Sequence, residues 1–332
     1  MSEKKSATII VTTYNVQQTI RQTMDCIVAS RVDFDFDIVV VDDQSTDNTV
    51  SILREYSINL IELEKNRGPA HARNIAIQAA SGEFLIFIDS DVVFPDDLLQ
   101  RMMDKINEDP KIGGVGSVSD PEPLNPNFFS RYFAMQEYYL ITSCASVNRN
   151  LGICTRCGIL RRKLFEEFGG FDERHRKPSI EDYQFSLRIR SSYDTYWDPD
   201  FVNQHHFPES FWQIMKRLHR NTREMIQVMS DLEVKDTGPY VNDTRSRIFI
   251  GFSGLLLLLV PFSLFFLIPS FVFMVGAIWI KRELLTLFIS RHGWIFAIKG
   301  WLIYVAICFP LLTGTFEGLI KARQRTASGE SQ

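Results

Sequence analysis

The sequence lacks a basic excess and has few cysteines. Among its 332 residues, 36 lysines and arginines stand against 40 aspartates and glutamates, which gives a formal net charge of −4 at pH 7. Nucleic-acid-binding domains usually carry a strong basic excess, so this composition argues against nucleic acid as the partner. The five cysteines follow a polar start, MSEKKSAT, that has no signal-peptide pattern. We therefore expect a reducing compartment for the N-terminal part, without disulfides.

Charge is missing altogether from residues 248–280, a run of 33 residues. As one helix this run would be about 50 Å long, against a hydrocarbon core of about 30 Å, so we expect a kinked span or a hairpin bent near Pro261 or Pro269. A second apolar stretch, 294–316, is interrupted only by Lys299 and is long enough to span once. A buried helical hairpin of a soluble protein is the alternative. The pattern predicts an integral membrane protein with an all-α transmembrane region at 248–320 and a polar tail at 321–332.

The first third of the chain alternates short apolar runs with helical patterns. The runs ATIIVTT, DIVVVDD, INLIEL and FLIFID are separated by helix-length segments, of which TDNTVSILREY has Ser45 or Thr46 as its expected N-cap. Such a series predicts parallel strands covered on both faces, hence an open α/β sheet. Ligands bind such sheets at the carboxyl ends of the strands. We therefore expect the polar clusters 12–15, 42–45 and 89–91 to converge on one crevice.

The segments that follow are less regular. Residues 119–207 are rich in aromatic and charged residues and are expected to bind the second substrate, whereas 7–118 would bind the first. Residues 208–232 place apolar residues at helical spacing with basic residues between them, which predicts an amphipathic helix within a juxtamembrane linker, 208–247. This helix either packs on the surface of the domain or lies at the membrane interface.

Two carboxylates, Asp89 and Asp91, end the apolar run 84–88. Two neighbouring anions repel unless a cation or water reaches both. Mg²⁺ and Mn²⁺ prefer hard oxygen ligands and are often held by one or two carboxylates together with substrate phosphates. The pair therefore predicts a divalent-metal site that carries a diphosphate. An acidic loop capping the helix after Pro95 is the alternative.

At this point the chain resembles a family 2 glycosyltransferase with the GT-A fold. The resemblance is carried in order by TIIVTTYN, DIVVVDDQSTDNT, NRGPAHARNIAIQAASGEFLIFIDSD, FGGFDER and EDYQFSLRIR. These motifs cover residues 7–207, and their joint specificity is high. The resemblance implies a GT-A domain at 1–207, with an open mixed sheet and helices on both faces.

The resemblance also implies which residues bind the nucleotide sugar, namely Thr12, Tyr14, Asn15, Asp43, Arg73 and Asp89. Tyr14 would stack on the base, and Asp43 would accept a hydrogen bond from it, which suits a planar base with N–H donors such as uracil. The alternative for Asp43 is an N-cap in the turn DDQST, and the alternative for Arg73 is an exposed helical arginine.

Asp182 is the predicted catalytic base, because an inverting transfer needs a carboxylate to take the proton of the acceptor hydroxyl. The alternative is that Glu181 and Asp182 complement the dipole of the helix that follows. By resemblance, His205 or His206 is a further metal or diphosphate ligand, with His205 preferred. Cys154 and Cys157 form a C-x-x-C that Cys144 could extend toward a zinc site, but packing residues are the favoured interpretation.

One departure from the family concerns polymer synthesis. Processive members carry Q-x-x-R-W near the membrane, whereas the nearest segment here, 213–217, reads QIMKR. We therefore expect transfer of a single sugar, from a UDP-linked donor to a glycan or lipid-linked acceptor, on the cytoplasmic side of the cell membrane. A polyprenyl-phosphate glycosyltransferase and a non-catalytic nucleotide-binding scaffold are the alternatives. The basic clusters after both apolar stretches favour the cytoplasmic side, which conflicts with a single crossing by the second stretch.

Overall fold

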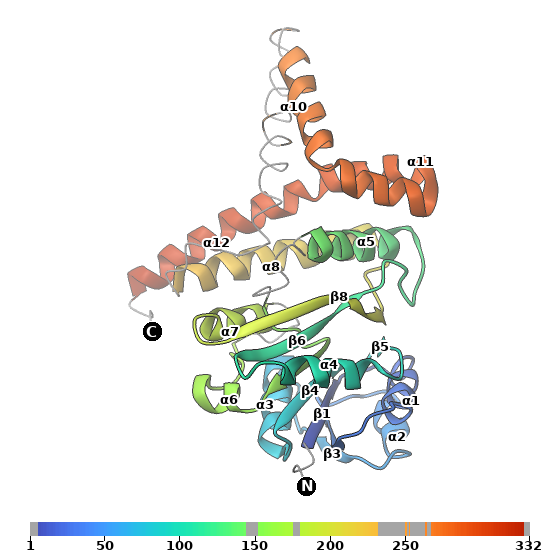
Figure 1. Ribbon diagram of the computed structural model, residues 1–332. Helices are drawn as coiled ribbons and strands as arrows, with labels where there is room; N and C mark the ends of the chain where they lie inside the picture. The colour runs from blue at the N-terminus through green and yellow to red at the C-terminus, as the bar shows by residue number, and fades with distance from the viewer. Residues whose placement is uncertain are drawn as a thin grey trace. The chain divides into compact units, whose positions relative to one another are not determined.

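The structure, a computed structural model, describes residues 6–143, 152–174, 180–231, 250, 252, 263 and 267–328. The chain divides into two compact units (Figure 1). The first consists of Met1–Asn125 and Ile141–His206, and the second of Pro126–Leu140 and Phe207–Gln332. The segment 126–140 thus belongs to the C-terminal unit, although it lies within the sequence of the first. The predicted boundaries at 207 and 247 stay predictions.

The first unit is built on a mixed sheet in the order β3-β2-β1-β4-β7-β6-β8-β5. The strands are β1 (Ser6–Thr13), β2 (Asp35–Asp42), β3 (Asn59–Glu62), β4 (Phe84–Asp89), β5 (Val92–Val93), β6 (Ile112–Ser119), β7 (Cys157–Arg161) and β8 (Asp194–His205). β1 to β4 run parallel to one another, whereas β7 is antiparallel to both β4 and β6. The predicted open mixed α/β sheet is confirmed.

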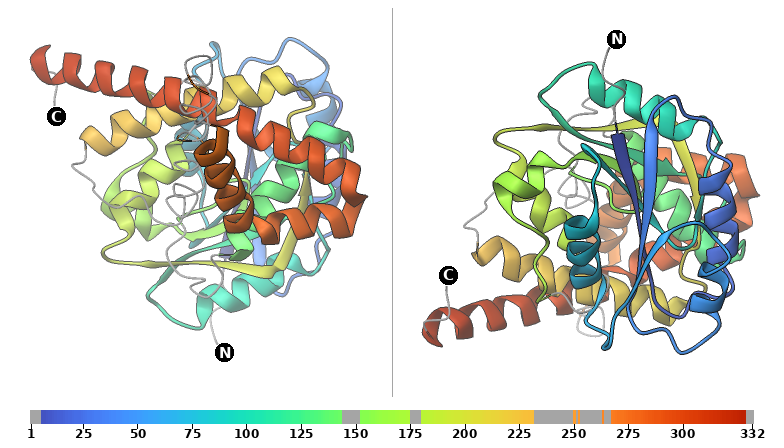
Figure 2. Two further views of the ribbon diagram at one scale, coloured as in Figure 1. Left: turned by 90° about the horizontal axis from the view of Figure 1, so that it is seen from above. Right: turned by 90° about the horizontal axis from the view of Figure 1, so that it is seen from below.

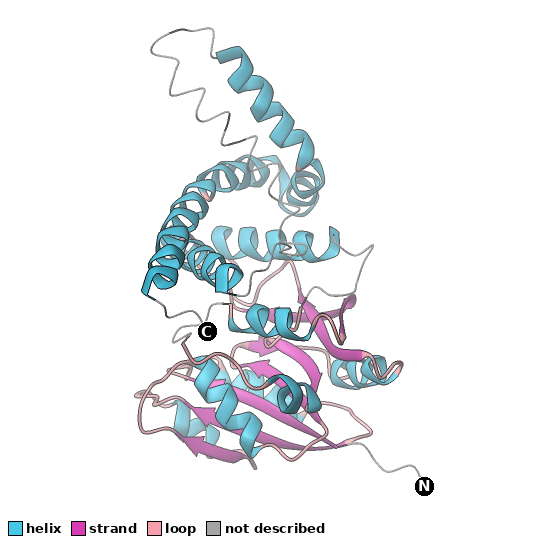
Figure 3. Cartoon of the chain, turned by 90° about the vertical axis from the view of Figure 1, so that its left-hand side faces the viewer, coloured by secondary structure: helices cyan, strands magenta, loops and turns pink. Residues whose placement is uncertain are grey.

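Helices cover both faces of this sheet (Figure 3). They are α1 (Ile20–Val28), α2 (Thr49–Leu53), α3 (Pro69–Ala79), α4 (Leu98–Asn107), α6 (Lys163–Phe168) and α7 (Glu181–Ile189). Because successive side chains of a strand point to opposite faces, Ile9 of β1 packs with α1 and α4, whereas Ile10 packs with α3 and α7. The views from above and below show the same layers (Figure 2). Two apolar layers therefore hold the strand ends at fixed positions.

The predicted N-cap of the second helix is wrong. Helix α2 has Asn48 as its N-cap, not Ser45 or Thr46, and it is only five residues long. The N–H of Thr46 is taken by Asn15 Oδ1 at 2.8 Å, and Asp47 Oδ1 accepts both the N–H and the hydroxyl of Thr49. These bonds hold residues 45–48 as a loop, because short polar side chains compete with the helix for backbone donors.

The regular secondary structure of the second unit is helical wherever the structure describes it. It comprises α5 (Phe128–Ser143), α8 (Phe211–Asp231), α10 (Leu267–Ile280), α11 (Arg282–Ala306) and α12 (Cys308–Ser328). Its core joins Tyr132 and Met135 of α5 to Ile214 of α8 and Phe288 of α11. The predicted amphipathic helix is confirmed as α8, and its apolar side packs inside this unit. Its position relative to a membrane stays a prediction.

The apolar C-terminal region is described only in part. Most of the run 248–280, with Pro261, lies outside the described residues, and Pro269 lies in the first turn of α10. Among the described residues, one stretch, Arg282–Gln324, is long and apolar enough to cross a membrane by length and composition, with a mean hydropathy of 2.1 over its most apolar 18 residues. Its backbone leaves the helical conformation at Gly293, where φ is 81° and ψ is 177°. A C-terminal apolar helical region is therefore present.

Candidate active site

The carboxyl ends of β1, β2 and β4 meet at one edge of the sheet, as predicted. Thr12 of β1 lies opposite Asp89 of β4 in the strand register. On the other side, the hydroxyl of Thr13 donates to Asp42 Oδ1 at 2.8 Å. The three polar clusters therefore border one region, because parallel strands end at a common edge.

The loop after β1 is held by Asn15, a residue in the left-handed conformation with φ of 54°. Its N–H donates to the hydroxyl of Ser45 at 2.8 Å, and its side-chain oxygen accepts the N–H of Thr46. Asn15 thus joins the ends of β1 and β2, while the ring of Tyr14 next to it is half exposed. An aromatic face in this position is accessible to a planar ligand. The nucleotide-binding roles of Thr12, Tyr14 and Asn15 stay predictions.

Asp43 is buried and fixes the start of α3. Its two carboxylate oxygens accept the backbone N–H groups of Arg67 and Gly68 at 2.9 and 2.8 Å. Gly68 has a φ of 94°, a backbone conformation that residues other than glycine adopt only under strain. The alternative of an N-cap in the DDQST turn is wrong, because Asp43 bonds to the loop before α3 instead. A carboxylate has about four acceptor sites, so these two bonds leave capacity for an N–H of a base.

Arg73, on α3, lies buried between carboxylates from two other elements. Its Nη1 donates to Glu181 Oε1 at 2.7 Å, and its Nη2 donates to Asp89 Oδ1 at 3.0 Å. Burial by itself would lower the pKa of Arg73, but the charges of Asp89 and Glu181 outweigh it and raise this pKa. The alternative of an exposed arginine is therefore wrong. Arg73 connects the end of β4 to the start of α7, residues that are distant in sequence.

Asp182 lies in the first turn of α7, directly after Glu181, and is partly buried. Its Oδ1 accepts the N–H of Tyr183 at 2.7 Å. The pKa of Asp182 is raised to about 6, first because the carboxyl group is desolvated and second because Glu181 is negatively charged, although Arg73 acts in the opposite direction. A carboxyl group with this pKa exchanges protons near neutral pH, as a general base must. Both acidic residues also stand where they complement the helix dipole.

Asp91 and His205 come together because β5 pairs antiparallel with β8. Val92 lies opposite His205 in this pairing, and Asp91 Oδ1 is 3.6 Å from His205 Nε2. Two ligands bonded to one ion at about 2.1 Å would lie about 3 to 4.2 Å apart, depending on their angle. The pair therefore fits a Mg²⁺ or Mn²⁺ ion, with substrate oxygens as further ligands. His205, which approaches Asp91, remains the preferred histidine.

The three predicted metal ligands do not form one cluster. Within the described ranges, no group of three or more His, Cys, Asp or Glu side chains is arranged to hold a metal ion. The reason lies at Asp89, one oxygen of which is bonded to Arg73. Asp91 and His205 converge, and Asp89 belongs to the arginine-centred group.

Cys154 and Cys157 are buried and free of disulfides. Burial raises the pKa of the Cys154 thiol, and it raises that of Cys157 to about 12. Cys157 pairs with Ile88 across β7 and β4, and its side chain packs in the apolar layer on one face of the sheet. These two cysteines are packing residues, as expected, and Cys144 lies outside the described residues.

Glu181 is the residue whose role the sequence did not indicate. It is buried at the start of α7, and it is the nearer partner of Arg73. A buried arginine needs anionic partners, so an acidic residue near Arg73 could be expected. The sequence does not reveal which of its 40 acidic residues is that partner. Glu181 both neutralises Arg73 and raises the pKa of Asp182.

An open mixed sheet with helices on both faces, and with carboxylates at the ends of its second and fourth strands, is like that of the GT-A glycosyltransferases. Residues 8–169 match the family Glycosyl transferase family 2. This part of the chain is therefore a family 2 glycosyltransferase domain.

Curated relatives match part of the chain as well. A poly-beta-1,6-N-acetyl-D-glucosamine synthase of Staphylococcus epidermidis is 30% identical over 142 residues, which are 42% of this chain and 34% of that protein. The synthase of the same description from Staphylococcus aureus strain COL is 26% identical over 155 residues, 46% of this chain and 37% of that one. The chain spans about a third of the length of these relatives.

Among solved structures, a mannosyltransferase from Pyrobaculum calidifontis in complex with GDP-Man and Mn²⁺ has a TM-score of 0.56 and 21% identity. The match covers 98% of this chain and 87% of that one. At this identity the likeness demonstrates the fold.

Proposed function

We propose that this protein is a membrane-attached, metal-dependent, inverting glycosyltransferase. It transfers a single sugar from a nucleotide-diphosphate donor, with UDP-linked sugars as the first choice, to a glycan or lipid-linked acceptor on the cytoplasmic side of a membrane. The observation that carries this proposal is the carboxyl group of Asp182, whose pKa is raised to about 6 beside the buried pair of Arg73 and Glu181 and the partly exposed Asp89. A protein that only binds a nucleotide has no need of a base with this pKa.

In the proposed reaction, Asp182 accepts the proton of the acceptor hydroxyl as its oxygen attacks the anomeric carbon. The bond between that oxygen and the carbon forms while the bond between the carbon and the diphosphate oxygen breaks. The electron pair leaves with the nucleoside diphosphate. The attack comes from the side opposite the leaving group, so the configuration is inverted and no covalent enzyme intermediate forms.

The donor site is proposed at the edge formed by β1, β2 and β4. Tyr14 stacks on the base, Asp43 accepts a hydrogen bond from it, and Thr12 and Asn15 border the same edge. Arg73 orients Asp89 toward the donor. Asp91 and His205 would hold a Mg²⁺ or Mn²⁺ ion, which would supply positive charge to stabilise the leaving diphosphate.

Two comparisons bear on the sugar. The staphylococcal relatives are named as synthases of a polymer of N-acetylglucosamine, which supports UDP-GlcNAc as the first donor to test. The Pyrobaculum structure holds GDP-Man and Mn²⁺, which supports a divalent metal and makes GDP-Man the second donor. Transfer of one sugar is favoured by the segment QIMKR, where Gln213 accepts the N–H of Glu209 at 2.8 Å and so takes part in starting α8.

The second candidate, a polyprenyl-phosphate glycosyltransferase, is favoured by the exposed apolar helices of the C-terminal unit, which suit a lipid acceptor. One assay that is run with two different acceptors distinguishes the two candidate functions. Release of nucleoside diphosphate is measured with each nucleotide sugar, with Mn²⁺, and with either a polyprenyl phosphate or a lipid extract that contains lipid-linked glycans.

The matched variants in this assay are Asp182→Asn and Asp200→Asn, the second of which changes an exposed carboxylate on β8. We expect Asp182→Asn to reduce transfer by about 10² to 10⁴ while nucleotide affinity stays near that of the wild type, and Asp200→Asn to change neither. Transfer at the wild-type rate by Asp182→Asn would refute the assignment of the base. Loss of nucleotide binding in that variant would move Asp182 into the donor site.

A further inference from the structure

Helices α8 and α12 of the C-terminal unit lie side by side in close contact (Figure 1). A Cβ atom at Gly314 of α12 would lie 2.6 Å from the carbonyl oxygen of His219, and one at Gly318 would lie 2.8 Å from that of Arg223. These distances are too short for any side chain, so the two backbones touch. Helices α8 and α12 therefore form one closely packed pair.

The contact between these helices is charged. The ring nitrogens of His219 lie 3.0 Å from Thr313 Oγ1 and 2.8 Å from Glu317 Oε2. Arg223 and Lys321 approach Glu317 at 3.4 and 2.8 Å. Ionisable groups are costly at the centre of a bilayer, where they face the bundle interior or a water-filled cavity. Lys321 and Glu317 of this cluster are 45% and 36% exposed, so a crossing helix would present charged groups to the hydrocarbon core.

The opposite side of the same region is a continuous apolar surface, here called the outer apolar face. Its side chains are between 42% and 72% exposed and recur at helical spacing on one side of the chain. They are Trp294, Ile295, Ile298, Leu302, Phe309, Leu312, Phe316, Leu319 and Ile320. On the inner side, Ala297, Tyr304 and Ile307 are buried in the core of the unit. Exposed apolar surfaces of this kind mark contact with a membrane or a protein.

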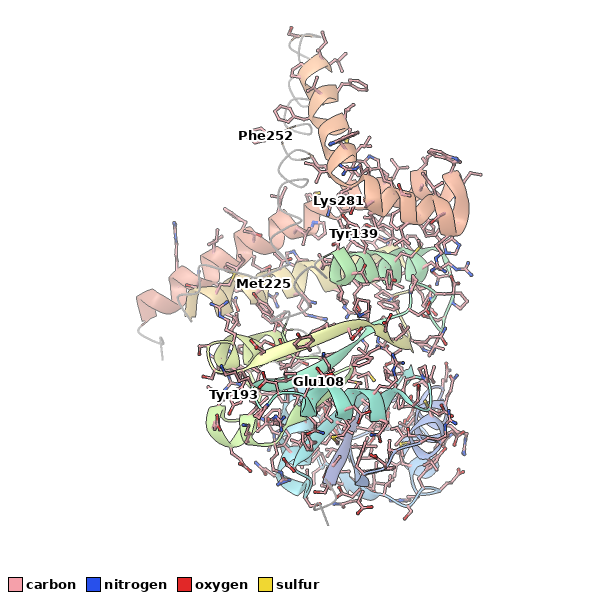
Figure 4. All side chains as sticks on the ribbon, in the orientation of Figure 1. Glu108, Tyr139, Tyr193, Met225, Phe252 and Lys281 are labelled. Carbon is pink, nitrogen blue, oxygen red and sulfur yellow. The ribbon has the colours of Figure 1, made fainter. Side chains whose placement is uncertain are left out.

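Basic residues around the outer apolar face indicate that this face contacts lipid. Arg291, Lys299 and Arg323 are exposed next to or within the outer apolar face. Lys281, before α11 begins, is buried instead and does not border this face; its ammonium group lies 5.3 Å from the ring centroid of Tyr139 (Figure 4). Apolar side chains bordered by lysine and arginine suit the boundary between acyl chains and anionic headgroups.

We propose that the region from Trp294 through α12 lies along the surface of a lipid bilayer, with the outer apolar face in the acyl-chain boundary, and does not cross it. The proposal rests on the membrane attachment of the proposed function, and it is independent of the transfer reaction. It also resolves the conflict over topology, because the basic residues after both apolar stretches then stay on one side. Insertion into the hydrocarbon core is left to the uncharged run 248–280, which cannot end on the opposite side of the bilayer because α8 before it and α12 after it are in contact. Its last part, α10, exposes apolar side chains such as Phe271 and Trp279.

Depth measurements on the full chain test this directly. Spin labels are placed one at a time at Ile295, Leu302, Phe309 and Phe316, in a background with the native cysteines replaced by serine. The protein is reconstituted into vesicles of phosphatidylcholine with phosphatidylglycerol. Depth is obtained from collisions with oxygen and with a water-soluble nickel complex. Labels at Ile268, Val275 and Trp279 of α10 are the matched control.

We expect the four outer positions to share one shallow depth, whereas depth along α10 changes by about 1.5 Å per residue. A crossing helix would instead place its middle positions about 15 Å deeper than its ends, and that profile would overturn the proposal. Exposure of all four labels to water in the presence of vesicles would overturn it too.

If the serine background does not fold, a fluorescent non-natural residue at the same positions, quenched by lipids brominated at fixed depths, gives the same profile. Transfer activity measured on the same vesicles separates an error in topology from an error in function.

Discussion

Replacing Asp182 by asparagine should stabilise the protein while abolishing its proposed chemistry. Asparagine is nearly isosteric with aspartate, is uncharged at every pH, and keeps an oxygen to accept the N–H of Tyr183. The variant therefore removes the cost of a desolvated charge next to Glu181 without opening a cavity.

The size of the effect follows from the pKa of Asp182, which is raised from 3.8 to about 6. Below pH 3.8 the group is neutral in the folded and the unfolded chain, so it has no cost. As the pH rises from 3.8 to about 6, the unfolded chain ionises first and the folded state becomes relatively less stable. Above pH 6 the full cost is present, about 3 kcal/mol. The substitution also removes the favourable interaction of the carboxylate with the dipole at the start of α7, which offsets up to about 1 kcal/mol of the stability gained.

We therefore expect Asp182→Asn to gain about 2 kcal/mol at pH 8, which corresponds to a rise in Tm of about 4 to 8 °C. Thermal unfolding of the detergent-solubilised protein at pH 8 and at pH 4.5 measures it, with Asp200→Asn as the control that should show no pH-dependent gain. The gain should be clearly smaller at pH 4.5. A gain of equal size at both pH values, or a loss of stability at pH 8, would refute the reasoning about the desolvated charge.

Three further substitutions test the donor site and the loop that supports it. Tyr14→Ala should raise the KM for the nucleotide sugar with little change in kcat, because stacking is lost equally from the ground state and the transition state; an unchanged KM in steady-state assays would exclude the stacking role. Asp91→Ala should abolish the stimulation of transfer by Mn²⁺ at unchanged Tm, and a Mn²⁺ titration that matches the wild type would contradict the metal assignment. Gly68→Ala should cost about 1 to 2 kcal/mol of stability, because φ is 94° at this position; denaturant unfolding measures it, and a neutral effect would show that the loop relaxes easily.

The sheet was predictable because its strands are short runs of β-branched and aromatic residues, such as DIVVVDD and FLIFID, separated by helical patterns. The meeting of Thr12, Asp43 and Asp89 at one edge followed from parallel strand direction alone. The bond from Arg73 to Glu181 was not predictable, because it joins residues 108 positions apart. Local hydrogen bonds of Asn15 and Asp47 shortened α2 in a way that propensity does not capture.

The C-terminal helices show a different limit. In 294–316 the inner and outer sides are both apolar, so the composition fits a span, and only the packing of α12 on the charged helix α8 distinguishes the two sides. Periodicity identifies a helix, but it cannot tell a side covered by protein from a side that contacts lipid when both are apolar.

The position of α5 has a practical consequence for anyone who wants a water-soluble form of the enzyme. Truncation after His206 would remove α8, α10, α11 and α12 of the C-terminal unit but would leave α5 in the remaining chain. Tyr132 and Met135, which are fully buried, would lose the partners on α8 and α11 that now cover them. Such a fragment should aggregate unless the buried side of α5 is redesigned with polar residues, so a simple C-terminal deletion is the wrong route to a soluble catalytic domain.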